Sequence, residues 1–421
     1  MQEDELSSST PPTAPPGNPY GGQSGNGYPG QSGQFAAAPG QQTGQHQVVS
    51  PNAAQPVIAN AHQPAPLQPV LPVEPTTQNA QSGGYRADGL DELHATAARI
   101  SANVERVLVG KPEVIRIALV TLLAEGHLLV EDVPGVGKTS LAKALARSID
   151  CSVSRLQFTP DLLPSDVTGV SIFNRQNNEF EFRPGPVFAN IVVGDEINRA
   201  SPKTQSALLE CMEEHQVTVD GNTYLLQSPF MVIATQNPIE MEGTYALPEA
   251  QRDRFTARVS IGYPDPAAEL AMVDGHAGRD PMSELQPVSD GAQVQRLVAA
   301  VRGVLMAQEV RRYAVELVTA TRRLPEIRIG ASPRSTLHLV QAARAQAALS
   351  GRDFVVPDDI QAVAVPVLAH RLVLTAEAQA ARRQPAELIR ALLQRIAIPH
   401  GAGDPSAQWV AGNTAAQPGP R

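Results

Sequence analysis

The segment DVPGVGKTS, residues 132–140, is the strongest indication of the fold in this sequence. It follows the apolar run HLLV at residues 127–130 and leads into the helical pattern SLAKALARSID at residues 140–150. A loop that binds phosphates needs glycines for close approach of its N–H groups, a lysine for the β- and γ-phosphates, and a hydroxyl for Mg²⁺. The stretch supplies these parts in Gly135, Gly137, Lys138 and Thr139. The sequence therefore predicts a phosphate-binding loop between a strand and a helix, with the helix dipole behind it.

The predicted contacts with a nucleotide extend over the whole loop: Asp132, Val133, Pro134, Gly135, Val136, Gly137, Lys138, Thr139 and Ser140. One position departs from the usual pattern, which has a glycine five residues before the Gly-Lys pair. Asp132 stands there instead. The strand–loop–helix context nevertheless disfavours a chance Gly-Lys turn.

A second motif, IVVGDEINRA at residues 191–200, is typical of the segment that completes such a site. An apolar strand that ends in two acids places them at the carboxyl edge of a sheet, where ligands of open α/β sheets bind. We expect Asp195 to hold Mg²⁺ together with Thr139, directly or through water. We expect Glu196 to polarise the attacking water. The plain alternative is an acidic strand end that only caps the next turn.

Three polar side chains further along the chain extend this candidate set. Asn237 follows the apolar run MVIA, where an amide could bond the attacking water, or it caps a turn. Arg254 lies in the charged segment LPEAQRDRF and could reach the active site of a neighbouring subunit, or it forms an exposed ion pair. Arg334 begins a helix, where a cation opposes the helix dipole, so a phosphate partner explains it better than solvent does. The candidate catalytic residues are Lys138, Asp195, Glu196, Asn237, Arg254 and Arg334.

Hydrophobic periodicity divides the chain into four parts. Residues 1–85 have no Lys or Arg and are rich in Pro, Gln, Gly and Ser, a composition that cannot bury enough apolar surface to fold. After this segment, short apolar runs alternate with helical patterns, which predicts a parallel α/β sheet flanked by helices. Beyond residue 264 only helical patterns remain. The predicted parts are a disordered tail at 1–86, an α/β core at 87–263, a small all-α domain at 264–400 and a loose tail at 401–421.

Two insertions in the predicted core have the pattern of β-hairpins. Residues 169–186, GVSIFNRQNNEFEFRPGP, carry alternating apolar residues on both sides of a polar turn. Residues 216–226 contain Asp220-Gly221, a strong signal for a two-residue turn. We expect both hairpins to lie on the surface.

Composition excludes several other classes of protein. No run approaches the roughly 18 apolar residues of a membrane span, and the acidic start MQEDELSSST is unlike a secretory signal. Two cysteines cannot form a disulfide scaffold or a four-cysteine zinc site. The formal net charge of −9 disfavours a general nucleic-acid surface. We expect a cytoplasmic protein without a membrane span.

Taken in order, the motifs resemble those of an AAA+ ATPase, with a P-loop NTPase core and a helical lid. The segments LVEDVPGVGKT, QFTPDLLPSDVTG, DEINRASPKTQSALLE, VIATQNP and GASPR are similar, more narrowly, to the MoxR family. The resemblance covers about residues 88–400. It implies ATP and Mg²⁺ as cofactors, a ring expected to be hexameric, and chaperone-like remodelling or maturation of protein complexes. It also implies a partner with a von Willebrand factor A domain and a protein client of unknown identity.

The resemblance assigns further roles position by position. Asn237 corresponds to the sensor 1 residue and Arg334 to the sensor 2 residue of the lid. Arg254 takes the place of the arginine in the family's DRF motif and is the better candidate for an arginine that acts in trans. Arg252 replaces a commonly apolar residue, so the choice between the two arginines stays open. Val109-Gly110 matches the segment that contacts adenine in similar proteins, although a plain turn would have the same sequence.

Two other interpretations share these groups. An AAA+ nucleic-acid motor has the same catalytic set but requires a basic pore, whereas FNRQNNEFEF is nearly neutral. A magnesium-chelatase-type motor subunit is the nearest relative in layout. DNA-stimulated ATP turnover would favour the first of these two alternatives.

Overall fold

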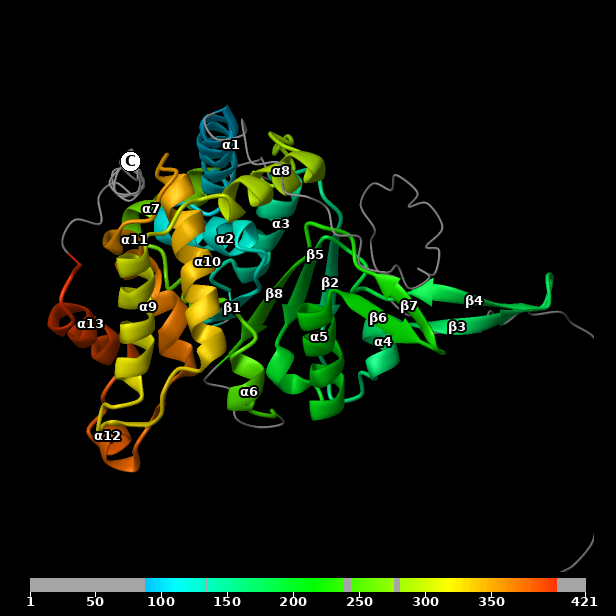
Figure 1. Ribbon diagram of the computed structural model, residues 1–421. Coiled ribbons are helices and arrows are strands. Elements are labelled where there is room, and N and C mark those ends of the chain that lie inside the picture. The colour runs from blue at the N-terminus through cyan, green and yellow to red at the C-terminus, as the bar shows by residue number, and fades with distance from the viewer. Residues whose placement is uncertain (1–87, 134, 238–243, 276–280, 400–421) are drawn as a thin grey trace, which may run out of the picture. The chain divides into compact units, whose positions relative to one another are not determined.

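The computed structural model describes residues 88–133, 135–237, 244–275 and 281–399. The two tails expected at 1–86 and 401–421, and the loop residue Pro134, lie outside the described residues. Figure 1 shows the arrangement of the helices and strands.

A five-stranded sheet in the order β2-β5-β8-β1-β9 forms the centre of the first half of the described chain, and every neighbouring pair in it is parallel. The strands are β1 (Leu128–Glu131), β2 (Val153–Gln157), β5 (Ile191–Asp195), β8 (Met231–Gln236) and β9 (Ala257–Val259). All five residues of β5 are buried, as expected for a central strand covered on both faces. The prediction of a parallel sheet flanked by helices is confirmed.

Alternate side chains of each strand enter two different apolar clusters. Val193 joins one cluster and Val192 the other, and Leu128 and Leu129 divide in the same way. Successive side chains of a strand point to opposite faces, so the sheet has an apolar layer on each side. One layer is covered by α1 (Asp88–Glu105), α2 (Pro112–Leu123) and α3 (Lys138–Ser148). The other is covered by α5 (Pro202–Glu214), with α4 (Pro164–Thr168), η1 (Ile197–Arg199) and α6 (Glu249–Arg252) in the same part of the chain.

The second half of the chain is mainly helical, and its apolar side chains continue the cluster that contains α1 to α3. Its helices are α7 (Pro266–Gly275), α8 (Gly291–Arg302), α9 (Gln308–Thr321), α10 (Pro333–Leu349), α11 (Pro357–Leu368), η2 (Ala369–Arg371), α12 (Ala376–Ala380) and α13 (Pro385–Arg395).

This half is not all-α, contrary to the sequence-based expectation. Two short strands, β10 (Ile327–Ile329) and β11 (Val373–Leu374), pair antiparallel. Strands of three and two residues are too short to show an alternating pattern, which explains why the sequence did not reveal them.

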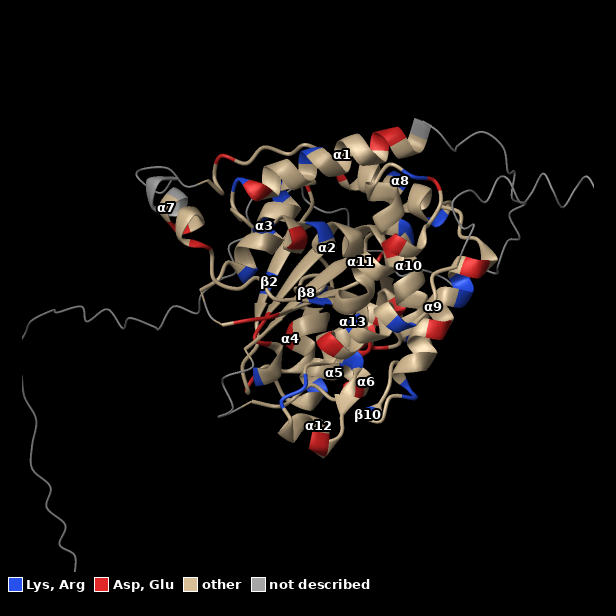
Figure 2. Cartoon of the chain, turned by 90° about the vertical axis from the view of Figure 1, so that its left-hand side faces the viewer, with Lys and Arg blue, Asp and Glu red and all other residues tan. Residues whose placement is uncertain are grey.

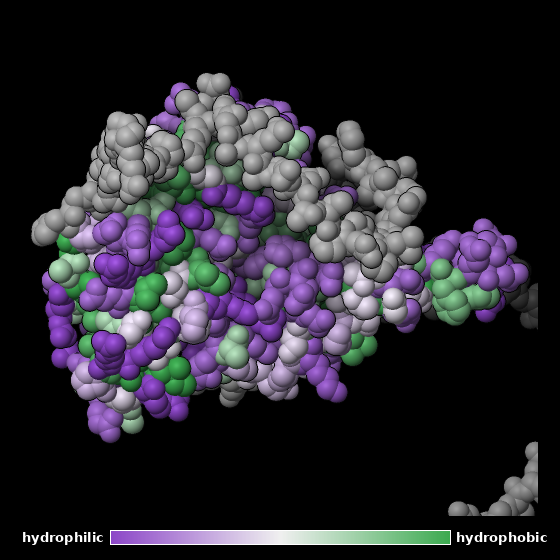
Figure 3. Space-filling model, in the orientation of Figure 1, coloured by the Kyte–Doolittle hydropathy of each residue, from purple (hydrophilic) through white to green (hydrophobic). Residues whose placement is uncertain are grey.

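Both expected hairpins are present. The first is β3 (Gly169–Asn174) with β4 (Glu179–Pro184), and the second is β6 (Gln216–Val219) with β7 (Asn222–Leu225). The β3–β4 hairpin extends away from the central sheet, and its outer part carries a hydrophobic patch (Figures 1 and 3). Phe173 and Phe180 form this patch, with ring centroids 5.3 Å apart, and Phe180 is 74% exposed.

Among the described residues, no helix is both long and apolar enough to cross a membrane.

Candidate active site

The glycine-rich loop connects β1 to α3 in the conformation that the motif requires. Gly135 and Gly137 have φ angles of 85° and 93°, a region that favours glycine, and Gly137 is the N-cap of α3. A Cβ on Gly137 would also lie 3.2 Å from Leu108 Cδ1. The Lys138 ammonium donates to the carbonyl oxygen of Asp132 at 2.7 Å, so its side chain lies along the loop. The lysine thus lies beside the loop at the amino end of α3, the arrangement that suits a bound phosphate.

Asp132 occupies the position where the usual motif has glycine, and the structure gives a reason. Its buried carboxylate accepts hydrogen bonds from the Gly262 N–H at 2.6 Å, the Ser260 hydroxyl at 2.9 Å and the Val133 N–H at 2.8 Å. Burial works to raise the pKa of Asp132, but these hydrogen bonds outweigh it, and the pKa lies below its usual value. The side chain thus ties the start of the loop to the segment that follows β9.

Thr139 and Asp195 come together as the candidate Mg²⁺ ligands. The Thr139 hydroxyl lies 3.4 Å and 3.3 Å from the two carboxylate oxygens of Asp195. Two adjacent ligands of an octahedral Mg²⁺, with bonds near 2.1 Å, lie about 3 Å apart. The pair therefore offers oxygen ligands at nearly the spacing that this ion needs.

Arg155, on the neighbouring strand β2, also contacts Asp195. Its Nε donates to Asp195 Oδ2 at 2.6 Å, and the Asp195 side chain is only 8% exposed. The guanidinium neutralises the carboxylate and places a positive charge beside the candidate metal site. A divalent cation that binds to Asp195 would therefore be repelled by the guanidinium of Arg155.

Glu196 follows Asp195 in a conformation that non-glycine residues seldom adopt, with φ at 59°. Its carboxylate oxygen Oε2 accepts from Gln157 Nε2 at 2.9 Å and pairs with Arg199 Nε at 3.0 Å. Backbone strain of this kind occurs where a site needs a side chain in a particular place. Here it turns Glu196 out of the strand while Gln157 and Arg199 hold its carboxylate.

Sequence reasoning missed Arg155, Gln157 and Arg199. Arg155 and Gln157 are two apart on β2 and therefore point to the same side of the sheet, but only the register of the strands shows which residues they meet. The parallel register between β2 and β5 then brings Gln157 level with Asp195.

Asn237 and the pair Val109-Gly110, the other residues predicted to lie at the nucleotide, are near the loop. Asn237 is buried directly after β8, and the Asp132 N–H bonds to the carbonyl of the residue before it, Gln236, at 3.2 Å. Val109-Gly110 precedes α2 beside Leu108, which contacts the loop at Gly137. The structure therefore brings both segments to the carboxyl edge of β1.

Arg254 and Arg334 lie elsewhere in the fold. Both pair with the carboxylate of Glu213 at the end of α5, Arg254 at 2.9 Å. The two arginines line a pocket with Gly126 and His127, which precede β1, whereas the phosphate-binding loop follows β1. The four residues of β1 span about 13 Å. Within one subunit, the two arginines thus lie at the opposite end of β1 from the loop, close to each other.

Sequence comparisons agree with this arrangement. Residues 127–257 match the family described as "ATPase family associated with various cellular activities (AAA)", and residues 319–392 match the AAA lid domain. Chaperone MoxR1 of Mycobacterium tuberculosis is 43% identical over 330 residues, which cover 76% of this chain and 86% of that protein. The chain belongs to the MoxR family of AAA+ ATPases. Protein MoxR of Methylorubrum extorquens is 31% identical over 335 residues, covering 74% of this chain and 97% of that protein.

Two further relatives match about three-quarters of this chain. YeaC of Bacillus subtilis, an uncharacterised protein, is 48% identical over 309 residues, covering 73% of this chain and 97% of that protein. The crystal structure of an inferred ATPase from Cytophaga hutchinsonii is 38% identical, with a TM-score of 0.69, over 74% of this chain and 97% of that one. As a member of the MoxR family this chain is a chaperone-like AAA+ ATPase, and AAA+ ATPases bind nucleotides. The expected AAA+ fold with a predominantly helical lid is confirmed.

Proposed function

We propose that this chain hydrolyses ATP at the loop between β1 and α3, with Mg²⁺, and uses the energy to remodel protein complexes. The observation that carries the proposal is the meeting of Thr139 and Asp195 at 3.3–3.4 Å beside the loop lysine. Bound Mg²⁺ would offset the charge of the phosphates, and Thr139 and Asp195 would hold it directly or through water.

In this proposal the acid and the amide act on the attacking water. Glu196 accepts a proton as the water oxygen bonds to the γ-phosphorus, and the bond between that phosphorus and the β–γ bridging oxygen breaks, which leaves ADP and phosphate. Asn237, at the end of β8, orients the water. Lys138 contacts the β- and γ-phosphates. Gln157 and Arg199 hold Glu196 in place, which the contacts at 2.9 Å and 3.0 Å support.

We further propose that Arg254 and Arg334 act on the nucleotide of a neighbouring subunit. Both are more than one-quarter exposed, with side-chain exposures of 30% and 38%, and both lie at the end of β1 away from their own loop. Arginines that stabilise the charge of a phosphoryl transfer can come from a second subunit. Between the two candidates Arg252 and Arg254, the shared contact with Glu213 favours Arg254.

A ring follows from arginines that act in trans, because each subunit then completes the site of the next. We propose a hexamer and, from the resemblance to the MoxR family, a partner with a von Willebrand factor A domain and a protein client. Acidic and basic residues are interspersed over the helices that Figure 2 labels, and this arrangement supports a protein client rather than a nucleic acid.

Three measurements test this proposal. ATP turnover should fall to background in Lys138→Ala and in Glu196→Gln, and Glu196→Gln should still bind ATP. Light scattering of Glu196→Gln with ATP should give a mass several times that of one 44.7 kDa chain. A pull-down with this variant in ATP should recover a protein client, whereas recovery of nucleic acid alone would count against the chaperone-like role.

A further inference from the structure

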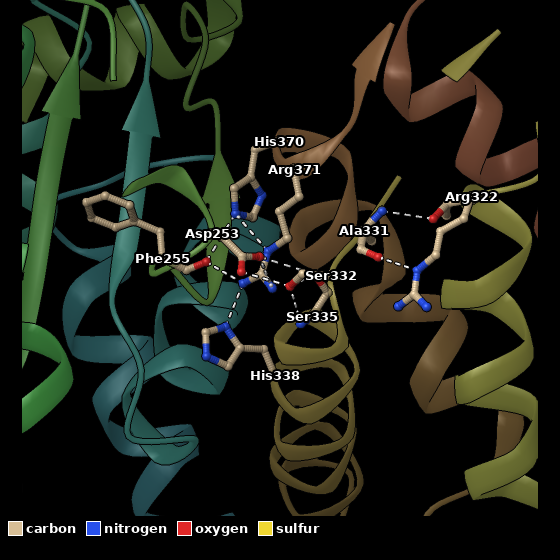
Figure 4. A network of polar contacts seen from close by, with 10 residues as sticks. Asp253, Phe255, Arg322, Ala331, Ser332, Ser335, His338, His370 and Arg371 are labelled. Carbon is tan, nitrogen blue, oxygen red and sulfur yellow. Dashed lines mark hydrogen bonds and ion pairs between the residues drawn. The ribbon is translucent and has the colours of Figure 1, made fainter. Parts of the chain in front are cut away.

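A buried polar network ties the segment around Arg254 to the C-terminal helices (Figure 4). The Asp253 carboxylate accepts from the Ser332 hydroxyl at 2.8 Å and from the Ser335 hydroxyl at 3.3 Å. It also pairs with Arg371 NH1 at 3.3 Å. One carboxylate next to the candidate trans arginine therefore contacts two different helical elements of the lid.

Arg371 holds the other side of the same segment. Its side chain is 1% exposed, and its NH2 donates to the carbonyl oxygen of Phe255 at 2.6 Å and contacts His338 Nδ1 at 2.6 Å. His370 Nε2 lies 3.1 Å from the same Phe255 oxygen. Side chains of the lid thus hold both neighbours of Arg254, Asp253 through its carboxylate and Phe255 through its backbone carbonyl.

The network also sets where Arg334 lies. Ser332 is the N-cap of α10, and Arg334 is the second residue of that helix. The Asp253 carboxylate lies at the amino end of α10, where the helix dipole favours a negative charge. Since Arg254 follows Asp253 directly, the hydrogen bond between Ser332 and Asp253 links the segment of Arg254 to the helix end that carries Arg334, in addition to the contact that both arginines make with Glu213.

We infer that Asp253 and Arg371 are positioning residues that hold Arg254 and Arg334 as a pair for the nucleotide of the neighbouring subunit. The inference rests on the proposed action of these arginines in trans. It assigns the lid a role in the hydrolysis of a neighbour's ATP, through an ion pair that does not touch the lid's own nucleotide. A change in the position of α10 then alters the arginine pair directly.

The matched control is a second buried ion pair in the lid. Arg352 contacts both carboxylate oxygens of Asp359 at 2.6 Å, and the Asp359 side chain is 2% exposed. This pair joins the turn before α11 to the start of that helix and, within the described residues, makes no hydrogen bond or ion pair with Asp253, Arg254 or Phe255. Asp359→Asn therefore tests the effect of losing a buried carboxylate charge without disturbing the arginines.

The test is complementation between subunits. Asp253→Asn should bind fluorescent ADP within about twofold of wild type, because its own loop is intact, and should lose ATP turnover about tenfold or more. Lys138→Ala is inactive but supplies intact arginines. When the two mix at random in equal amounts, about half of the Asp253→Asn subunits gain an intact neighbour, so turnover averaged over all Asp253→Asn subunits should return to about half of the wild-type rate. Asp359→Asn should keep turnover per folded subunit within about twofold of wild type.

Normal turnover in Asp253→Asn, or lost turnover that Lys138→Ala does not restore, would overturn the inference. If circular dichroism shows that Asp253→Asn does not fold, the double variant Ser332→Ala with Ser335→Ala takes its place. It breaks the link between Asp253 and α10 but keeps the ion pair with Arg371. A mixture of Arg254→Ala with Lys138→Ala tests the action of the arginine in trans separately from the positioning role of Asp253. If ATP turnover does not recover in that mixture, the action in trans itself is contradicted. If turnover recovers there but not in the mixture with Asp253→Asn, only the positioning role is contradicted.

Discussion

Protonation of His127 should destabilise this fold in mild acid. Nε2 of His127 lies 2.9 Å from the carbonyl oxygen of Met212, which can only accept, and Nδ1 accepts from the Val232 N–H at 3.0 Å. The buried neutral ring is therefore bonded at both nitrogens. A second proton on Nδ1 would face the Val232 N–H, so the charged ring loses a hydrogen bond as well as its hydration.

The size of the effect follows from the pKa. Burial is the main cause that lowers the pKa of His127 from 6.5 to about 4; the hydrogen bond to Met212 opposes the shift and His215 adds to it. His127 takes up a proton near pH 6.5 in the unfolded chain but only near pH 4 in the folded chain. The stability that the neutral ring contributes is therefore complete above pH 6.5 and is lost as the pH falls from 6.5 to about 4. Between about pH 7.5 and about pH 5 the loss from this ring is about 2 kcal/mol.

Urea unfolding followed by circular dichroism, at both pH values, measures this loss. Burial also lowers the pKa of His338, to about 3, and that of His370, so wild type should lose more than the share of His127 alone. In His127→Gln, which keeps a side-chain donor near Met212, the drop in unfolding free energy should be smaller than in wild type by about 2 kcal/mol. His94→Gln, at an exposed position, controls for the loss of an imidazole. Equal drops in wild type and His127→Gln would refute the reasoning.

Three other substitutions test the site and the sheet. Arg155→Gln removes the cation beside Asp195, so Mg²⁺ should bind there more tightly. In a fluorescence titration, the Mg²⁺ concentration that gives half of the maximal nucleotide affinity should fall severalfold. An unchanged or higher concentration would argue against competition between Arg155 and Mg²⁺ for Asp195. Gly194→Ala places a Cβ 3.0 Å from Phe158 Cε2 in the buried strand β5, and chemical denaturation should show a loss of about 1–3 kcal/mol. Asp132→Gly restores the usual loop residue but removes the hydrogen bonds of the carboxylate, so the unfolding free energy from urea denaturation should fall by about 2 kcal/mol or more; a more stable variant would contradict the anchoring role.

Local chemistry made the phosphate-binding loop and the acidic strand end predictable. The glycines, the lysine and the hydroxyl that bind phosphates lie within one short segment of sequence, and the backbone conformation at Gly135 and Gly137 agrees with such a loop. The parallel sheet followed from apolar runs that alternate with helical patterns. In contrast, β10 was too short to leave a pattern.

The side of the fold on which a residue lies could not be predicted from local pattern. Arg334 was correctly expected near the start of a helix, but only tertiary contacts place that helix beside Arg254 and away from the loop. Arg155 and Asp195 are separated by 40 positions, so their ion pair depends on the register of two strands. The same holds for Asp253 and Arg371, whose contact joins two distant segments.

We propose that this chain hydrolyses ATP with the carboxylates at the end of β5. The most direct test compares ATP turnover and ATP binding in wild type and Glu196→Gln under identical conditions, with Mg²⁺. We expect turnover by wild type, and in Glu196→Gln a loss of about a hundredfold or more with ATP affinity retained. Turnover by Glu196→Gln at the wild-type rate would contradict it.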